Sequence, residues 1–139
     1  MPTQTISPPR EIQRCISDCM TCHRVCLETI PHALSMGGVH AHPDHIRMLM
    51  DCAQICQTSA DFMIRGSPLH QRTCGVCAEI CDQCANECER IGHDEQMRMC
   101  AEVCRRCAEI CHQMSTWRGP SRFESYVPVR PYEMAARWP

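Results

Sequence analysis

The sequence has few of the large apolar and aromatic side chains that fill most protein cores. Ile, Leu, Val and Phe make up about 16% of its 139 residues, below the roughly 20% that separates folded chains from disordered ones. Aromatic residues account for 4%. The other apolar side chains are mainly 15 cysteines and 10 methionines. Because a free cysteine packs as a small apolar side chain, a core made largely of thiols can still form.

Several other features are missing. No apolar run of 18 residues is present, so we expect no membrane-spanning helix and no membrane partner. The net charge of −2, with both signs interspersed, does not favour binding to nucleic acid. The first ten residues lack the basic and apolar regions of a signal peptide. We therefore expect a cytoplasmic protein of one domain, whose thiols stay reduced.

The cysteines recur in Cys-x-x-x-Cys units that are often separated by two residues. Four units read Cys-Ala-(Glu/Gln)-(Ile/Val)-Cys, as at Cys77–Cys81. Spacings of three and four place side chains on one face of a helix, and Ala and Glu are good helix formers. The pattern therefore predicts helices with stripes of candidate metal-binding thiols, at Cys15, Cys19, Cys22, Cys26, Cys52, Cys56, Cys74, Cys77, Cys81, Cys84, Cys88, Cys100, Cys104, Cys107 and Cys111.

Glycine and proline divide these stripes into four helices. Gly37 ends the first, Pro43 begins the second, and Ser67 with Pro68 provides an N-cap and first turn for the third. Short connections predict an all-α, antiparallel, up-down-up-down four-helix bundle with a cysteine-lined core. The predicted helices span residues 9–36, 43–65, 68–91 and 93–115, within a bundle at 9–116 that follows a flexible N-terminus (1–8) and precedes a Pro- and aromatic-rich tail (117–139).

Stripes of cysteines along helices are poorly suited to disulfides, iron–sulfur clusters and thiol redox catalysis. Neighbouring β-carbons on a helix lie about 5–6 Å apart, whereas a disulfide needs about 3.8 Å. Iron–sulfur clusters take cysteines from loops, and thiol oxidoreductases need a βαβ context, so we expect no enzyme. Soft ions fit better, since a linear Cu(I) bridge spans about 4.6 Å between sulfurs. Zinc binding, or a redox-responsive thiol protein that senses metal or oxidation, is the alternative.

Repeated Cys-x-x-x-Cys units with Cys-x-x-Cys offsets on four helices resemble the bacterial copper storage proteins. The absence of a leader is similar to their cytosolic branch, and the resemblance covers about residues 9–115. It implies a homotetramer of bundles that store or sequester Cu(I), with many ions held along each bundle axis. Copper donors and acceptors would be further partners. The resemblance implies that the ligands are the seven Cys-x-x-x-Cys pairs together with Cys74.

Other soft side chains continue the stripes toward the end of the bundle that holds the first and third connections. His45 and His93 lie on the predicted stripes there, with Met97 beside them. Imidazole and thioether hold Cu(I) less tightly than thiolate does, which suits a place where ions are received. These three residues are therefore candidate additional ligands. In the second helix the thiol stripe is interrupted at Ser59.

The opposite end of the predicted bundle has a second set of candidates. Asp61 and His112 flank the stripe near the last cysteine of the fourth helix; we expect ordinary surface side chains there, with additional metal ligands as the alternative. His70, Met63 and Met114 lie at the same end. We expect these three to close that end as a packed plug, with a second gate for ions as the alternative.

Overall fold

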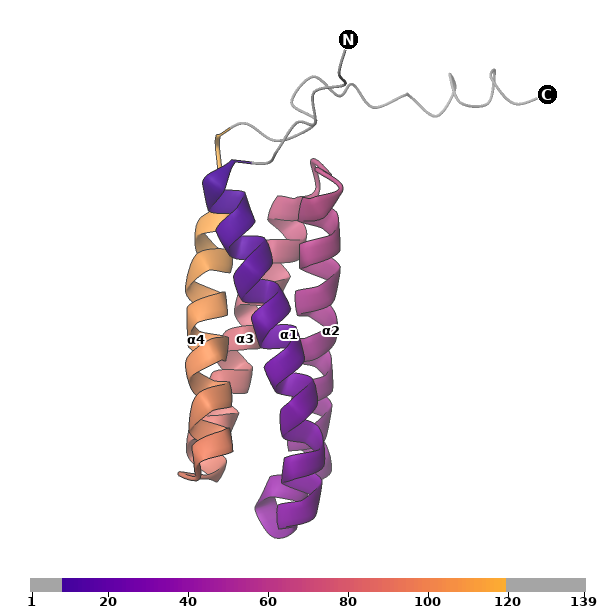
Figure 1. The fold of residues 1–139 in the computed structure, drawn as a ribbon, viewed down its shortest axis with the longest axis vertical. Coiled ribbons are helices and arrows are strands. Elements are labelled where there is room, and N and C mark those ends of the chain that lie inside the picture. The colour runs from indigo at the N-terminus through magenta and orange to yellow at the C-terminus, as the bar shows by residue number, and fades with distance from the viewer. Residues whose placement is uncertain (1–8, 120–139) are drawn as a thin grey trace, which may run out of the picture.

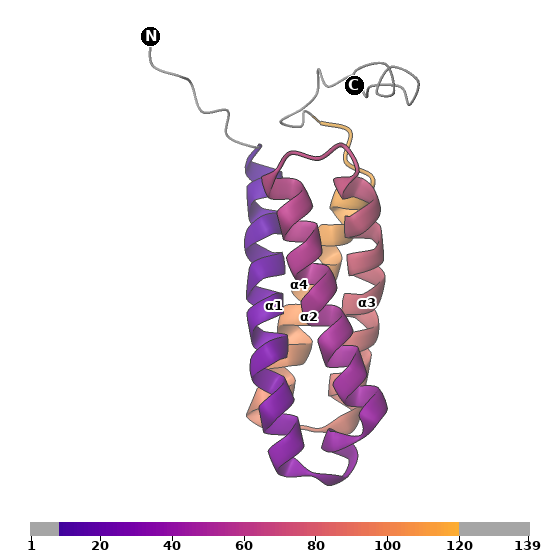
Figure 2. The same ribbon diagram turned by 90° about the vertical axis from the view of Figure 1, so that its right-hand side faces the viewer.

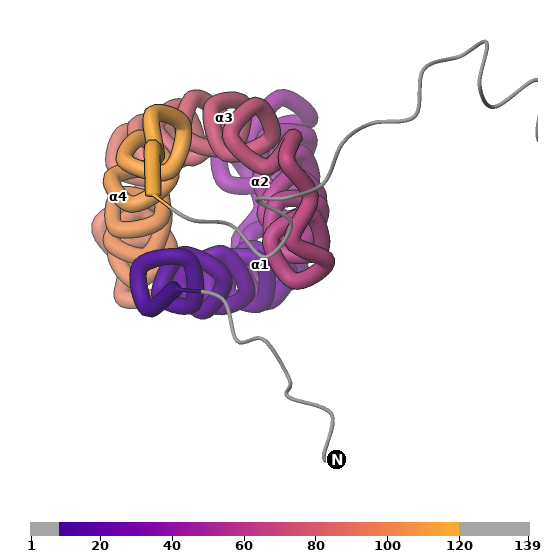
Figure 3. Tube along the Cα trace, turned by 90° about the horizontal axis from the view of Figure 1, so that it is seen from above, coloured from indigo at the N-terminus to yellow at the C-terminus, as the bar shows by residue number. Residues whose placement is uncertain are grey.

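The computed structural model describes residues 9–119, which form four long helices and one short 3₁₀ helix. Consecutive long helices run in opposite directions, side by side (Figure 1, Figure 2). Each packs against the next along the chain, and α4 packs against α1, which closes a ring of four (Figure 3). The predicted bundle is confirmed. Its elements are α1 (Arg10–Met36), η1 (Gly38–Ala41), α2 (Pro43–Ile64), α3 (His70–Ile91) and α4 (Glu95–Ser115).

The two ends of the bundle differ in what closes them. The loop end carries η1 and the connection between α3 and α4, and the N-terminal end carries the start of α1, the α2–α3 connection and the end of α4 (Figure 2). Trp117, just after α4, is partly buried against the core at the N-terminal end. The flexible segment predicted for residues 1–8 and most of the predicted tail lie outside the described residues.

Local sequence explains where most helices begin and end. Gly37 ends α1 with φ at 71°, a conformation that favours glycine, and its N–H bonds to the Ala33 carbonyl at 3.2 Å. Pro43 occupies the first turn of α2, where its missing N–H costs nothing. Asp94 is the N-cap of α4, because its side chain accepts the Met97 N–H at 3.4 Å.

Two predicted helix starts are wrong by about two residues. The third helix begins at His70, because Ser67 caps a preceding turn: its Oγ accepts the Leu69 N–H at 3.1 Å. The fourth helix begins at Glu95, so His93 precedes both the helix and its N-cap. Ser and Asp side chains compete for nearby N–H groups in turns as well as at helix starts, which makes such boundaries hard to place from sequence.

The core is built mainly of thiols, with few branched aliphatic side chains. All fifteen cysteines are 0% exposed, and alanines at neighbouring positions let the helices approach one another. Leu49 is the largest fully buried aliphatic side chain, and most isoleucines are only partly buried around the column. Within residues 9–119, no helix combines the length and hydropathy needed to cross a membrane.

Candidate metal centre

The buried thiols form one continuous cysteine column along the bundle, made of all fifteen cysteines. The Cys22 Sγ is 4.0 Å from that of Cys26 on the same helix. It is also 3.8 Å from Cys52 on α2 and 3.7 Å from Cys104 on α4. The Cys52 Sγ in turn lies 3.7 Å from Cys81 on α3. Thiols of different helices are therefore as close as the in-helix pairs that the sequence indicates.

The column contains overlapping sets of four thiols whose Sγ atoms all lie within 4.8 Å of one another. Sets such as Cys22–Cys26–Cys52–Cys104 draw on three helices, so a bound ion would connect helices as well as turns. Sets that share members include Cys22–Cys26–Cys52–Cys104, Cys22–Cys52–Cys56–Cys81 and Cys56–Cys77–Cys81–Cys107. Because thiols are shared between sets, a bridging thiolate can belong to two neighbouring metal ions.

The sulfur–sulfur distances suit metal ions with three or four thiolate ligands. The closest contact is 3.5 Å, between Cys19 and Cys111, and several pairs lie at 3.7 to 3.9 Å, such as Cys22 with Cys104 and Cys107 with Cys111. With metal–sulfur bonds of about 2.3 Å, trigonal and tetrahedral sites need sulfurs about 4.0 and 3.8 Å apart. The four-thiol sets admit separations of up to 4.8 Å, which include the roughly 4.6 Å of a linear bridge. The closest contact is much longer than the roughly 2.05 Å of a disulfide bond. All fifteen cysteines are free.

The thiols of the column influence one another's ionisation. The pKa of Cys100 is lowered, chiefly by its hydrogen bond with Cys104. The pKa of Cys84 is raised to about 11, with the hydrogen bond to Cys100 as the largest cause and burial adding to it. A buried thiolate without a cation is costly, so one ionised thiol disfavours ionisation of its neighbours. A metal cation supplies the missing charge, and its binding would release protons.

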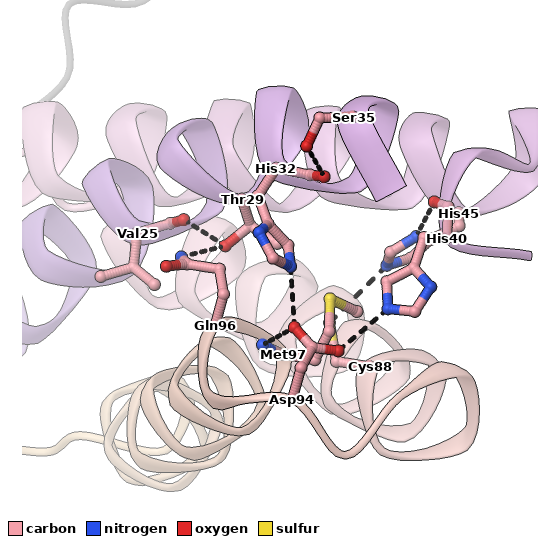
Figure 4. A network of polar contacts seen from close by, with 10 residues as sticks. All are labelled: Val25, Thr29, His32, Ser35, His40, His45, Cys88, Asp94, Gln96 and Met97. Carbon is pink, nitrogen blue, oxygen red and sulfur yellow. Dashed lines mark hydrogen bonds and ion pairs between the residues drawn. The ribbon is translucent and has the colours of Figure 1, made fainter. Parts of the chain in front are cut away.

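At the loop end, His45 presents a ring nitrogen to the column. Its side chain is 1% exposed. The Nδ1–H donates to the His40 carbonyl at 2.6 Å, and the Nε2 lies 3.9 Å from the Cys88 Sγ (Figure 4). A backbone carbonyl that accepts from Nδ1 fixes the tautomer whose Nε2 carries a lone pair, as in many metal-binding histidines. The structure thus brings His45 to a terminal thiol, as predicted.

Of the other two candidate ligands at the loop end, Met97 is buried on the stripe and His93 is exposed. Met97 is 0% exposed and lies on the buried face of α4, one turn before Cys100. His93 is exposed and precedes the N-cap of α4, so it does not lie on the predicted stripe. The expectation for His93 was wrong because the helix starts two residues later than predicted, which removes the periodicity that placed it inside.

Three polar side chains, which we call the polar clasp, join α1, η1 and the α3–α4 connection at the loop end. His32 Nε2 lies 2.7 Å from Asp94 Oδ2, and His40 Nε2 lies 2.9 Å from Asp94 Oδ1 (Figure 4). Partial burial acts to raise the pKa of Asp94, but the hydrogen bonds from His40 and His32 outweigh it and lower that pKa to about 2. A Cβ at Gly92 would lie 2.6 Å from Asp94 Oδ1, so the clasp also needs glycine there.

Asp94→Asn should destabilise the metal-free protein at neutral pH, because the two histidines lose a charged hydrogen-bond acceptor. The expected loss is only about 1 kcal/mol, because the carboxylate is partly exposed to solvent. The pKa of Asp94 is depressed on folding, so its contribution is complete above about pH 4 and is lost as the pH falls through about 2. Urea unfolding followed by circular dichroism at pH 7 and pH 3 measures both effects. Asp82→Asn is the matched control, because Asp82 pairs with an exposed histidine at the opposite end. Equal losses in the two variants would contradict a special role for the clasp.

At the N-terminal end, both predicted additional ligands lie outside the column. His112 is exposed, and its Nε2 lies 2.9 Å from Asp82 Oδ2. Asp61 accepts a hydrogen bond from the Gln57 amide at 2.8 Å on the outer side of α2. The structure brings neither side chain to the thiols, since each lies on a different face of its helix from the cysteines. The side chains that do reach the column here are His70, Met63 and Met114, at 3%, 1% and 2% exposure.

Comparison with known proteins places this arrangement among copper-binding bundles. A family model described as copper storage protein matches residues 9–116. A crystal structure from Nitrosospira multiformis is 47% identical, covers 76% of this chain and 95% of that chain, and has a TM-score of 0.72.

Two further structures carry a description of function. A cytosolic copper storage protein from Streptomyces lividans, with five coppers, is 32% identical, covers 78% of this chain and 95% of that chain, and has a TM-score of 0.72. Apo copper storage protein 3 from Bacillus subtilis is 32% identical, covers 75% of this chain and 98% of that chain, and has a TM-score of 0.67.

Proposed function

The chain belongs to the copper storage protein family, and from this premise we propose that it stores many Cu(I) ions on the thiolates of its cysteine column. The observation that carries the proposal is the column itself: fifteen free, fully buried thiols on four helices, many of them in overlapping sets of four whose sulfurs lie within 4.8 Å of one another. Soft thiolates select Cu(I) among the common cellular ions. Shared thiolates let successive ions bind side by side, which a store requires and a single structural site does not.

We further propose that His45 and Met97 act as additional ligands where the column ends at the loop end. His45 is held with its Nε2 toward Cys88, and Met97 is buried on the face of α4 that carries Cys100. Neutral imidazole and thioether add no negative charge, so an ion bound there is held less tightly than one among thiolates alone. An ion held in this way can pass inward to the column.

The cellular setting and assembly are also proposals. The Streptomyces lividans relative is described as cytosolic, and free thiols suit a reducing compartment, so we propose a cytosolic store. Storage needs no acid–base or nucleophilic group, and we propose a non-enzymatic role. We retain the homotetramer as a proposal, with copper donors and acceptors as its transient partners. Sedimentation of the full chain at micromolar concentration tests the assembly.

Anaerobic titration of the reduced protein with Cu(I), in competition with a chromophoric chelator, should saturate at about one ion per cysteine, close to 15. Saturation at one or two ions would contradict storage. Zinc is the matched comparison, because tetrahedral four-thiolate sites fit the same distances and would saturate at about three or four ions. Zinc that Cu(I) fails to displace would favour the zinc or sensor alternative over copper storage.

A further inference from the structure

Two buried polar atoms at the N-terminal end of the bundle lack a hydrogen-bond partner in the described part of the chain. They are the Ser59 Oγ and the His70 Nε2. His70 is the more informative, because its side chain is 3% exposed and its Nδ1 lies 2.9 Å from the Ser67 carbonyl. The Nδ1–H donates to that carbonyl, so the Nε2 carries a lone pair inside the protein. Buried nitrogen lone pairs without a donor are rare and call for an explanation.

Two sulfur atoms lie close to this end of α3. Cys74 is one helical turn after His70 on the same buried face, and side chains at that spacing have β-carbons about 5–6 Å apart. The Cys74 Sγ is 3.8 Å from the Sδ of Met63, which α2 contributes at 1% exposure. One thiol and one thioether from two helices therefore meet where the cysteine column ends, and the buried His70 lies one helical turn from the thiol.

The opposite end of the column has the same construction. There the His45 Nδ1–H is bonded to a loop carbonyl, and the Nε2 lies 3.9 Å from the Sγ of a terminal cysteine, Cys88. At both ends a buried histidine pairs its Nδ1 with a backbone carbonyl and leaves the Nε2 lone pair inside the protein; at the loop end that nitrogen faces a thiol, and at the N-terminal end it has no partner within the described residues. A plug made for packing alone would not need this orientation, since an apolar side chain of similar size fills the space without a buried lone pair.

We propose that His70 Nε2, Cys74 Sγ and Met63 Sδ form a single Cu(I) site that closes the N-terminal end of the cysteine column. This inference rests on the proposed function. On binding, the Cys74 thiol releases its proton to solvent, and the thiolate, the thioether and the neutral imidazole coordinate the ion. One thiolate balances the single charge of Cu(I), so the complex is neutral and its burial beside the N-terminus of α3 is favourable.

The same ligand set discriminates against zinc. Protein zinc sites use cysteine, histidine and carboxylate ligands, and do not use methionine. A divalent ion on one thiolate would also leave a buried positive charge. A thioether beside a thiolate is a donor set that selects Cu(I). The site should therefore respond to Cu(I) and stay unchanged in zinc.

The test follows His70 and Met63 by nuclear magnetic resonance during anaerobic loading of the full chain, labelled with ¹⁵N-histidine and ¹³C-methyl methionine. In the wild-type protein, Cu(I) should shift both the His70 Nε2 and the Met63 methyl resonances, and zinc should leave the Met63 methyl unchanged. His70→Asn keeps a donor for the Ser67 carbonyl and removes Nε2, so the Met63 shift should be lost or much reduced. Met63→Leu conserves volume and should reduce the His70 shift in the same way.

His112→Asn is the matched control, because His112 lies at the same end but on the outside. It should leave both shifts intact. If the thiols load fully with copper while the His70 and Met63 resonances do not move, this inference is overturned and storage stands. If copper occupies neither the column nor this end, the proposed function fails and the end site fails with it.

Discussion

Loading the reduced protein with Cu(I) is expected to raise its melting temperature by tens of degrees. The metal-free core buries thiols and alanines, which remove less apolar surface from water than leucine or isoleucine would. Each ion that binds only the folded state adds about 4 kcal/mol when its free concentration is a thousandfold above its Kd. For a domain of this size each kcal/mol is worth roughly 2–8 °C, so a few occupied sites suffice. Circular dichroism melts under anaerobic conditions measure the shift.

Helix α2 offers a sharp control, because it carries only Cys52 and Cys56. These two thiols contact those of α1, α3 and α4, for example at 3.8 Å to Cys22 and 3.6 Å between Cys56 and Cys81. Their joint replacement by alanine should leave α2 attached to the copper network only at its two ends, through His45 and Met63, and leave a smaller copper-induced shift.

The matched variant replaces Cys107 and Cys111, which removes as many thiols but leaves α4 attached through Cys100 and Cys104. Its copper-induced shift should stay closer to that of the wild-type protein. A melting temperature that does not change at copper saturation would contradict the cross-linking account for the whole column.

Ser59→Ala is expected to stabilise the metal-free protein by about 1–2 kcal/mol. The Ser59 side chain is 0% exposed and its Oγ has no partner within the described residues, so the hydroxyl bears a desolvation cost that alanine avoids. Ser59→Cys should give a similar gain, and should also add a thiol between Cys56 and Met63 on α2. We expect it to bind about one more Cu(I) than Ser59→Ala, as chelator competition would show.

Thr29 carries a buried hydroxyl that, unlike that of Ser59, has hydrogen-bond partners within the described residues. It is equally buried, but its hydroxyl donates to the Val25 carbonyl at 2.7 Å and accepts from the Gln96 amide at 2.9 Å (Figure 4). Thr29→Val keeps the shape and should destabilise the protein by about 1 kcal/mol, because two bonded groups lose their partner. Urea unfolding of the two variants should give changes of opposite sign. A loss of stability in Ser59→Ala would show that its hydroxyl does have a partner, such as a buried water.

The sequence alone determined the parts of this structure that depend on helical period. Cysteines spaced by three and four had to share a face, and the lack of other apolar side chains required that face to point inward. The same reasoning correctly oriented His45 and Met97. The helical period also indicates that His112 does not lie on the thiol stripe, because the residue directly after Cys111 is rotated by about 100° from it. Taken strictly, the same period excludes both His112 and Asp61 as ligands.

Only the tertiary structure decided which thiols of different helices meet, and what lies at the two ends of the column. The 3.7 Å contact between Cys22 and Cys104 spans 82 positions in the sequence, and the polar clasp joins three separate elements. Neither follows from a repeat along one helix. Distances between helices depend on crossing angles and on the rotation of each helix about its axis, which are set by packing against all the neighbours at once.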